Sequence, residues 1–108
     1  MLSKKNRLTR SQFNDVLKVG RKLHTPLFTI VYSPEETFSA SVVVGKKVYK
    51  QAVKRNRLRR QVYSVVSDIY TKKQIKGSLI VIIKPLASSL GRKKLLEDIQ
   101  NSLNEFVK

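Results

Sequence analysis

Residues 46–69 read KKVYKQAVKRNRLRRQVYSVVSDI, a dense run of cations that leads directly into an apolar helical pattern. Eight of the fifteen residues from 46 to 60 are Lys or Arg, and none is acidic. From Leu58 onward, apolar residues recur at the spacing of one buried helical face: Leu58, Val62, Val65, Val66 and Ile69. The stretch predicts a helix that begins near Lys54 or Arg55, preceded by a basic loop.

The cations of this helix are predicted to lie away from its apolar stripe. At about 100° per residue, the arc opposite the stripe holds Asn56, Arg57, Arg59, Arg60 and Tyr63. A helix extended back to Lys54 would place its ammonium over the stripe, whereas Arg55 falls near the stripe's edge, within reach of the sheet. Such crowding of like charges costs self-repulsion that a polyanion removes on binding, with release of its counterions. Arg fits phosphate bidentately and Tyr63 offers a ring for stacking, so nucleic acid is the predicted partner.

The whole chain supports a folded, basic, intracellular protein. It carries 23 Lys plus Arg against 7 Asp plus Glu, a net charge of +16 on 108 residues, and 41% of its residues are hydrophobic. This composition predicts a single compact domain over residues 1–108. Cysteine is absent, the basic N-terminal stretch 1–10 leads into no apolar signal run, and the longest apolar runs are too short to span a bilayer. We expect a cytoplasmic location and no membrane partner.

Local signals outline the other elements. Thr9-Arg10-Ser11-Gln12 matches a capping box before a helix at about 10–19, with Leu8 and Phe13 as a hydrophobic staple and Gly20 as its stop. Strand-like runs occupy 27–32, 38–44 and 78–84, and a last helix carries Leu95, Leu96, Ile99, Leu103 and Phe106 on one side. Whether two or three strands separate the first two helices is left open by the pattern.

These elements predict an α+β fold, a two-layer α/β sandwich in the order α-β-β-β-α-β-α with a small mixed central sheet. The strand–helix–strand crossover of such a sheet is right-handed by the general rule.

The sequence predicts no catalytic site within this chain. Its acids are scattered over predicted turns and helix surfaces, and His24 is the only histidine. A nuclease needs a carboxylate cluster for metals or a general acid and base, so no metal ligands or organic cofactor are predicted here. Aromatic residues beside a sheet offer a second kind of site. Phe13, Leu17 and Phe28 are either core residues or, with Lys46 and Lys47, one wall of a cleft for a single strand.

The string Lys54-Arg55-Asn56-Arg57-Leu58-Arg59-Arg60 resembles the Arg-Asn-Arg signature of the bacterial ribonuclease P protein subunit. Its surroundings are similar as well. Residues 44–48 resemble the strand end before the signature, and residues 84–88 resemble the segment after the last strand. Arg7-Leu8 followed by Phe13, Val16 and Gly20 resembles the first helix of the family. The chain departs from the family pattern in having Leu17 for a second aromatic, Tyr63 for a frequent Arg, and no Gly at 49–51.

The resemblance implies a left-handed strand–helix–strand crossover, against the general rule. It implies a protein that binds a large catalytic RNA and assists metal-dependent removal of the 5′ leader from precursor tRNA, with no obligate protein partner. The RNA subunit would carry the chemistry and hold the Mg²⁺, and the isolated chain would be inactive. The implied RNA-binding residues are Lys54, Arg55, Asn56, Arg57, Arg59, Arg60 and Tyr63. The implied leader cleft has Phe13, Leu17, Phe28, Lys46 and Lys47.

Two other readings share the charge and size of this chain. A small ribosomal or RNA-chaperone protein would bind RNA without any role in leader removal. A DNA-binding regulator would place the helix at 55–70 in a major groove, although the strand-rich surroundings of that helix argue against a helix-turn-helix.

Overall fold

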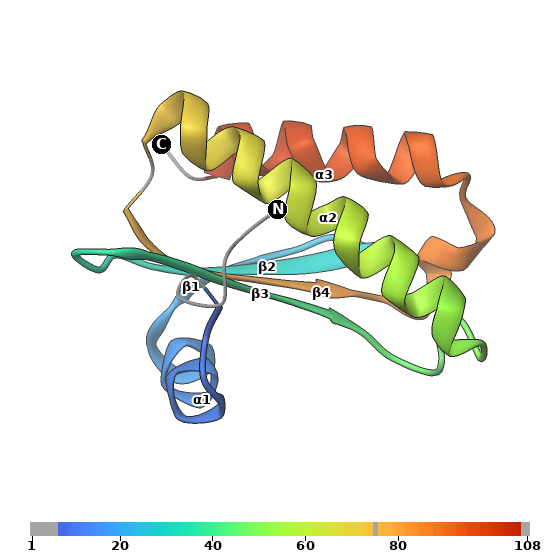
Figure 1. The fold of residues 1–108 in the computed structure, drawn as a ribbon, viewed down its shortest axis with the longest axis horizontal. Helices are drawn as coiled ribbons and strands as arrows, with labels where there is room; N and C mark the ends of the chain where they lie inside the picture. Colours follow the sequence, from blue (N-terminus) through green and yellow to red (C-terminus); the bar gives the residue numbers. More distant parts are fainter. Residues whose placement is uncertain (1–6, 75, 107–108) are drawn as a thin grey trace.

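The computed structural model describes residues 7–74 and 76–106, which form a four-stranded sheet with helices on both faces (Figure 1). Residues 1–6, 75 and 107–108 of the predicted domain lie outside this range, and with them most of the basic stretch 1–10. Along the chain the elements are α1 (Arg10–Val19), β1 (Arg21–His24), β2 (Phe28–Ser33), β3 (Phe38–Val44), α2 (Ala52–Lys73), β4 (Gly77–Ile83), the 3₁₀ helix η2 (Pro85–Ser89) and α3 (Arg92–Phe106). The predicted α+β class and element order are confirmed, and the strand left open by the sequence is β1.

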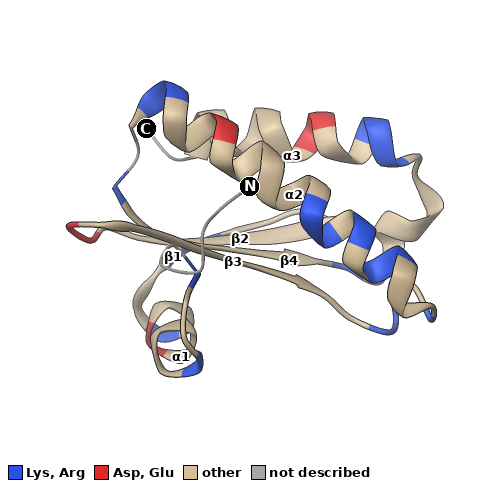
Figure 2. Cartoon of the chain, viewed as in Figure 1, with Lys and Arg blue, Asp and Glu red and all other residues tan. Residues whose placement is uncertain are grey.

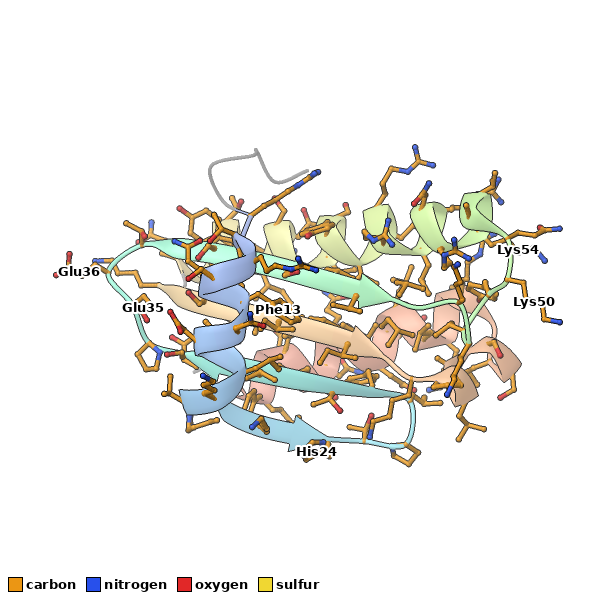
Figure 3. All side chains as sticks on the ribbon, turned by 90° about the horizontal axis from the view of Figure 1, so that it is seen from below. Phe13, His24, Glu35, Glu36, Lys50 and Lys54 are labelled. Atoms are coloured by element: carbon orange, nitrogen blue, oxygen red, sulfur yellow. The ribbon has the colours of Figure 1, made fainter. Side chains whose placement is uncertain are left out.

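The sheet has the strand order β1-β2-β4-β3. Strand β4 pairs antiparallel with β2 and parallel with β3, in a register that runs from Phe38 opposite Gly77 to Val44 opposite Ile83. In Figure 1, β3 lies in front, the chain returns through α2 above the sheet, and β4 lies behind β3. To an observer who looks along β3 from its start to its end, the path from β3 through α2 to β4 turns counterclockwise. The view from below in Figure 3 gives the same arrangement. The crossover is therefore left-handed, which corrects the general rule and confirms the resemblance.

The main core fills the space between the sheet and the pair α2 and α3. The predicted stripe of α2 is buried there at Leu58, Val62, Val66 and Ile69, with Val65 packed against it. Leu95, Ile99 and Leu103 of α3 are buried in the same cluster. The outer halves of both helices remain free for charged side chains.

Helix α1 packs on the opposite face of the sheet, where Val16 meets Val31 and Ile80. The predicted capping box is present: the Gln12 N–H donates to Thr9 Oγ1 at 3.3 Å, and the Thr9 N–H donates to Gln12 Oε1 at 3.0 Å. Leu8 and Phe13 both pack against the small cluster beneath the helix, as a staple requires.

Gly20 does end α1, but its physical role differs from the predicted one. Its backbone is extended, with φ −70°, rather than left-handed. A Cβ at this position would lie 2.7 Å from both the Val16 carbonyl oxygen and the Val31 Cγ1 atom. Glycine is needed here for close approach between the helix end and the sheet.

Helix α2 begins at Ala52, earlier than predicted. Its N-cap residue, Gln51, makes no side-chain capping bond, so the local sequence carries no start signal there. Lys54 is exposed, and Figure 3 shows it past the end of the sheet. The first turns of α2 overhang the core, which is why Lys54 does not cover the apolar stripe. No helix in the described ranges has the length and apolar character to cross a membrane.

Candidate nucleic-acid interface

Basic residues are densest at one end of the molecule, around the start of α2. In Figure 2, Lys and Arg cover the first turns of α2, the loop before it and the start of α3. Figure 3 places Lys50 and Lys54 at this end, and Glu35 and Glu36 at the other, in the turn between β2 and β3. A polyanion that approaches this protein therefore meets an attractive potential at the end where α2 begins.

One flank of α2 forms a cationic cleft, which we call the first cleft. It is a cavity of about 330 Å³ lined by Arg7, Asn56, Arg59, Arg60 and Tyr63. The Arg59 Nη1 donates to the Asn56 Oδ1 at 2.7 Å. This bond leaves the other guanidinium N–H groups of Arg59 available, so Asn56 orients its neighbour toward a ligand. Oriented guanidinium groups suit the paired oxygens of a phosphate.

Arg55 has a different task from its neighbours. Its Nη1 donates to the carbonyl oxygens of Tyr49 at 3.0 Å and Lys50 at 2.7 Å. Arg55 was expected within reach of the sheet, but the partners of these two bonds lie in the loop that precedes α2. Arg55 fixes the path of this loop and so the position of the surrounding cations.

Tyr63 does not lie on the exposed arc where helical phasing placed it. Its side chain is 7% exposed, and its Oη accepts the Val42 N–H at 3.2 Å. The Arg7 guanidinium lies 5.2 Å from the centre of its ring. The prediction failed because α2 contacts both α3 and β3, so its buried surface is wider than one stripe. The Tyr63 hydroxyl supplies a hydrogen-bond acceptor to β3, and the Tyr63 ring lies beneath the Arg7 guanidinium.

The other flank of α2 holds the remaining cations of the signature. Lys54 and Arg57 line a cavity of about 230 Å³ with Tyr49 and Arg92. Sequence analysis overlooked Arg7 and Arg92, each brought to α2 from a distant part of the chain. The capping box places Arg7 just before α1, but no local pattern brings either residue to the basic helix.

The five residues predicted for a leader cleft are not brought together. Phe13 and Leu17 are half-buried on the α1 face of the sheet. Phe28 is 2% exposed in the main core on the opposite face, so its predicted place in the cleft is wrong. Successive residues of a strand point to opposite faces. Phe28 therefore points to the same face as Ile30, toward the main core, and not to the α1 face with Val31. Lys46 and Lys47 are exposed in the turn that follows β3.

Acidic residues of the described chain do not form a metal centre. Among residues 7–74 and 76–106, no group of three or more His, Cys, Asp or Glu side chains is placed to hold an ion. His24 instead contacts the Thr29 hydroxyl, with 3.2 Å between Nδ1 and Oγ1. The chemistry that this surface offers is recognition of an anion through Arg, Lys and amide groups.

Comparisons with known proteins agree with this architecture. The family model described as Ribonuclease P matches residues 2–107. The ribonuclease P protein component of Nitratiruptor sp. is 28% identical over 91% of this chain and 88% of its own length. That of Lactobacillus johnsonii is 33% identical over 80% and 75%. The ribonuclease P protein from Thermotoga maritima superposes with a TM-score of 0.74 at 24% identity, covering 93% of this chain and 96% of that one. A Staphylococcus aureus RNase P protein mutant with defective mRNA degradation activity gives 0.81 at 20%, covering 94% and 88%.

The fold and the two flanks of α2 define a small α+β protein with a cationic helix mounted on a mixed sheet. The chain belongs to the ribonuclease P protein family. It is thus a component of a ribonuclease, works with the RNA subunit of that enzyme, and takes part in tRNA processing.

Proposed function

We propose that this chain binds the catalytic RNA of ribonuclease P through the first turns of α2, and the 5′ leader of precursor tRNA across the α1 face of the sheet. In doing so it assists hydrolytic removal of the leader, which leaves a 5′-phosphate on the mature tRNA. The observation that carries the proposal is the unpaired cation cluster at the start of α2. The family membership names the RNA that such a cluster would meet.

The signature residues have the geometry of a phosphate-binding surface. In the part of the chain that the structure describes, the one ion pair found joins Lys94 to Asp98 on α3, so the α2 cations have no acidic partner. Asn56 and Arg60 are exposed, and Arg59 is held by Asn56. Neutralising several backbone phosphates releases counterions, which makes binding strong and salt-dependent.

The α1 face offers a different surface, suited to a single strand. In Figure 3, α1 crosses only part of this face, and the sheet continues beyond it toward the turn after β3. Ser41 and Val43 point to this face because their neighbours Val42 and Val44 are buried on the other. The leader would run from the half-buried Phe13 and Leu17, across these small side chains, to Lys46 and Lys47. Stacking on Phe13 would hold a base, and the lysines would neutralise backbone phosphates.

The proposed division of labour leaves the chemistry to the RNA. Water attacks the scissile phosphodiester with the help of Mg²⁺ held mainly by the RNA subunit, and this chain lowers the electrostatic cost of assembling two polyanions. The acids of the described chain are dispersed and do not form a metal centre. The chain would act in the cytoplasm, with the catalytic RNA and precursor tRNA as its partners and no membrane or obligate protein partner.

The test is cleavage of precursor tRNA at low Mg²⁺ with the protein alone, the RNA subunit alone, or both. We expect no cleavage by the protein, slow cleavage by the RNA and fast cleavage by the mixture. The stimulation should weaken with Arg60→Ala and persist with Lys72→Ala, which removes the same charge at the far end of α2. Cleavage by RNA-free protein would overturn the division of labour, and a mixture no faster than RNA alone would overturn the function.

A further inference from the structure

The basic signature is divided between two flanks of α2, and only the first cleft holds its Asn-Arg pair. Lys54 and Arg57 are one helical turn apart and share the flank that faces α3. There they line a separate cavity with Tyr49 from the loop and Arg92, the first residue of α3. We call this cavity the second cleft. Its position on the opposite flank means that one phosphate does not serve both clefts.

The second cleft concentrates positive potential without relief. Lys54, Arg57 and Arg92 form no ion pair within residues 7–74 and 76–106. Both α2 and α3 begin at this end of the molecule (Figure 1), and neither has an acidic residue in its first turn. Their N-terminal dipoles add to the three side-chain charges. Such a site attracts an anion that can accept from several directions.

The wall of the second cleft favours a nucleotide over a free ion. Tyr49 is half-buried against the core, and its carbonyl oxygen is held by Arg55 at 3.0 Å. The main chain of Tyr49 is thus held in place, and Tyr49 lines the cavity. An aromatic residue packed beside cations suits the sugar or base that flanks a backbone phosphate.

We propose that the second cleft binds a backbone phosphate of the ribonuclease P RNA, with Arg57 and Arg92 as joint ligands and Tyr49 against the adjoining nucleotide. The RNA would then contact α2 on both of its flanks, and it would contact α3 through Arg92. The proposal rests on the proposed function and extends it to a part of the chain outside the signature.

The test measures the dissociation constant for the ribonuclease P RNA as a function of salt. Arg92→Ala is compared with Lys93→Ala, which removes the same charge from the next position on α3 but lines no part of the cleft. We expect Arg92→Ala to weaken binding about tenfold and to reduce the salt slope by about one unit. Lys93→Ala should leave the slope unchanged. Circular dichroism verifies the fold of each variant.

Two further variants sharpen the result. Arg92→Lys keeps the charge and should retain the slope while losing part of the affinity, because Lys does not reproduce the planar fork. The double variant of Arg57→Ala and Arg92→Ala should lose less affinity than the sum of the single losses if both residues hold one phosphate. The proposal is overturned if Arg92→Ala behaves like Lys93→Ala, or if the two losses add. Wild-type stimulation of leader removal would still stand in that case, whereas its absence would sink the proposed function itself.

Discussion

The two faces of the sheet differ in what they leave exposed. On one face, α2 and α3 bury Phe28, Ile30 and Val81 in a continuous core, and charged side chains occupy the outer surface of the helices. On the other face, α1 covers Val31 and Ile80 and leaves the rest of the sheet without a helix in the described chain (Figure 3). The first face holds a cationic helix rigidly on the core. The second face leaves part of the sheet surface open to a ligand. We therefore expect RNA binding on the helical face to depend mainly on charge, and leader binding on the other face to depend more on stacking.

The largest expected effect concerns an aromatic residue that serves only the core. Phe28→Ala removes a fully buried ring and should lower the free energy of unfolding by about 3–5 kcal/mol. Denaturant unfolding measures the loss. The fraction that remains folded should bind precursor tRNA as the wild type does. A small stability loss together with a large loss of leader affinity would instead show that Phe28 contacts the leader.

Phe13 on the opposite face should behave in the reverse way. Phe13→Ala should reduce the preference of the assembled enzyme for precursor over mature tRNA by about 1–3 kcal/mol, the range for loss of one stacked base. Its salt dependence should hardly change, because no charge is removed. Competition binding with the two tRNA forms measures the preference. An unchanged preference together with a stability loss near 3 kcal/mol would make Phe13 a core residue alone.

Arg60 tests the cationic side of the comparison. Arg60→Ala should weaken binding to the catalytic RNA by about 1.5 kcal/mol and reduce the salt slope by about 0.9, without changing the preference for the leader. Titrations at several salt concentrations measure both quantities. Lys72→Ala is the matched control, since it lies in the last turn of the same helix. Equal effects of the two variants would show that only total charge matters.

The smallest effect is expected at Tyr63, between the cationic cleft and the core. Tyr63→Phe keeps the ring beneath Arg7 but removes the acceptor for the Val42 N–H. Unfolding should become easier by about 1 kcal/mol, while affinity for the catalytic RNA stays the same. Thermal unfolding and a single binding titration suffice. Lost affinity with unchanged stability would place the Tyr63 hydroxyl in contact with RNA.

Burial that depends on local periodicity was predictable, and burial that depends on distant partners was not. The stripe from Leu58 to Ile69, the capping box at Thr9 and strands β2, β3 and β4 appear in the sequence because each is encoded by neighbouring residues, whereas β1 does not. Tyr63 was assigned to the wrong face because its burial comes from contact with β3. Helical phasing carries no information about contacts with other elements. Phe28 was misplaced because a strand's phase does not say which face carries α1.

The site follows the same rule. The Arg-Asn-Arg signature was visible because its members are consecutive, and its resemblance to a known family named the partner. Its division into two clefts was not visible, since Arg7 and Arg92 reach α2 only through the fold. The left-handed crossover came from the resemblance and not from the general rule of connection, which favours the other hand.

Photo-cross-linking from thiouridine placed in the leader of precursor tRNA tests the central claim most directly. The assembled enzyme is irradiated, and the cross-linked peptides of this chain are mapped. If the claim holds, cross-links fall on α1 around Phe13 and Leu17 and on the turn at Lys46 and Lys47, and not on the first turns of α2. Leader cross-links confined to residues 52–60 would contradict it, because the leader would then share the surface assigned to the catalytic RNA.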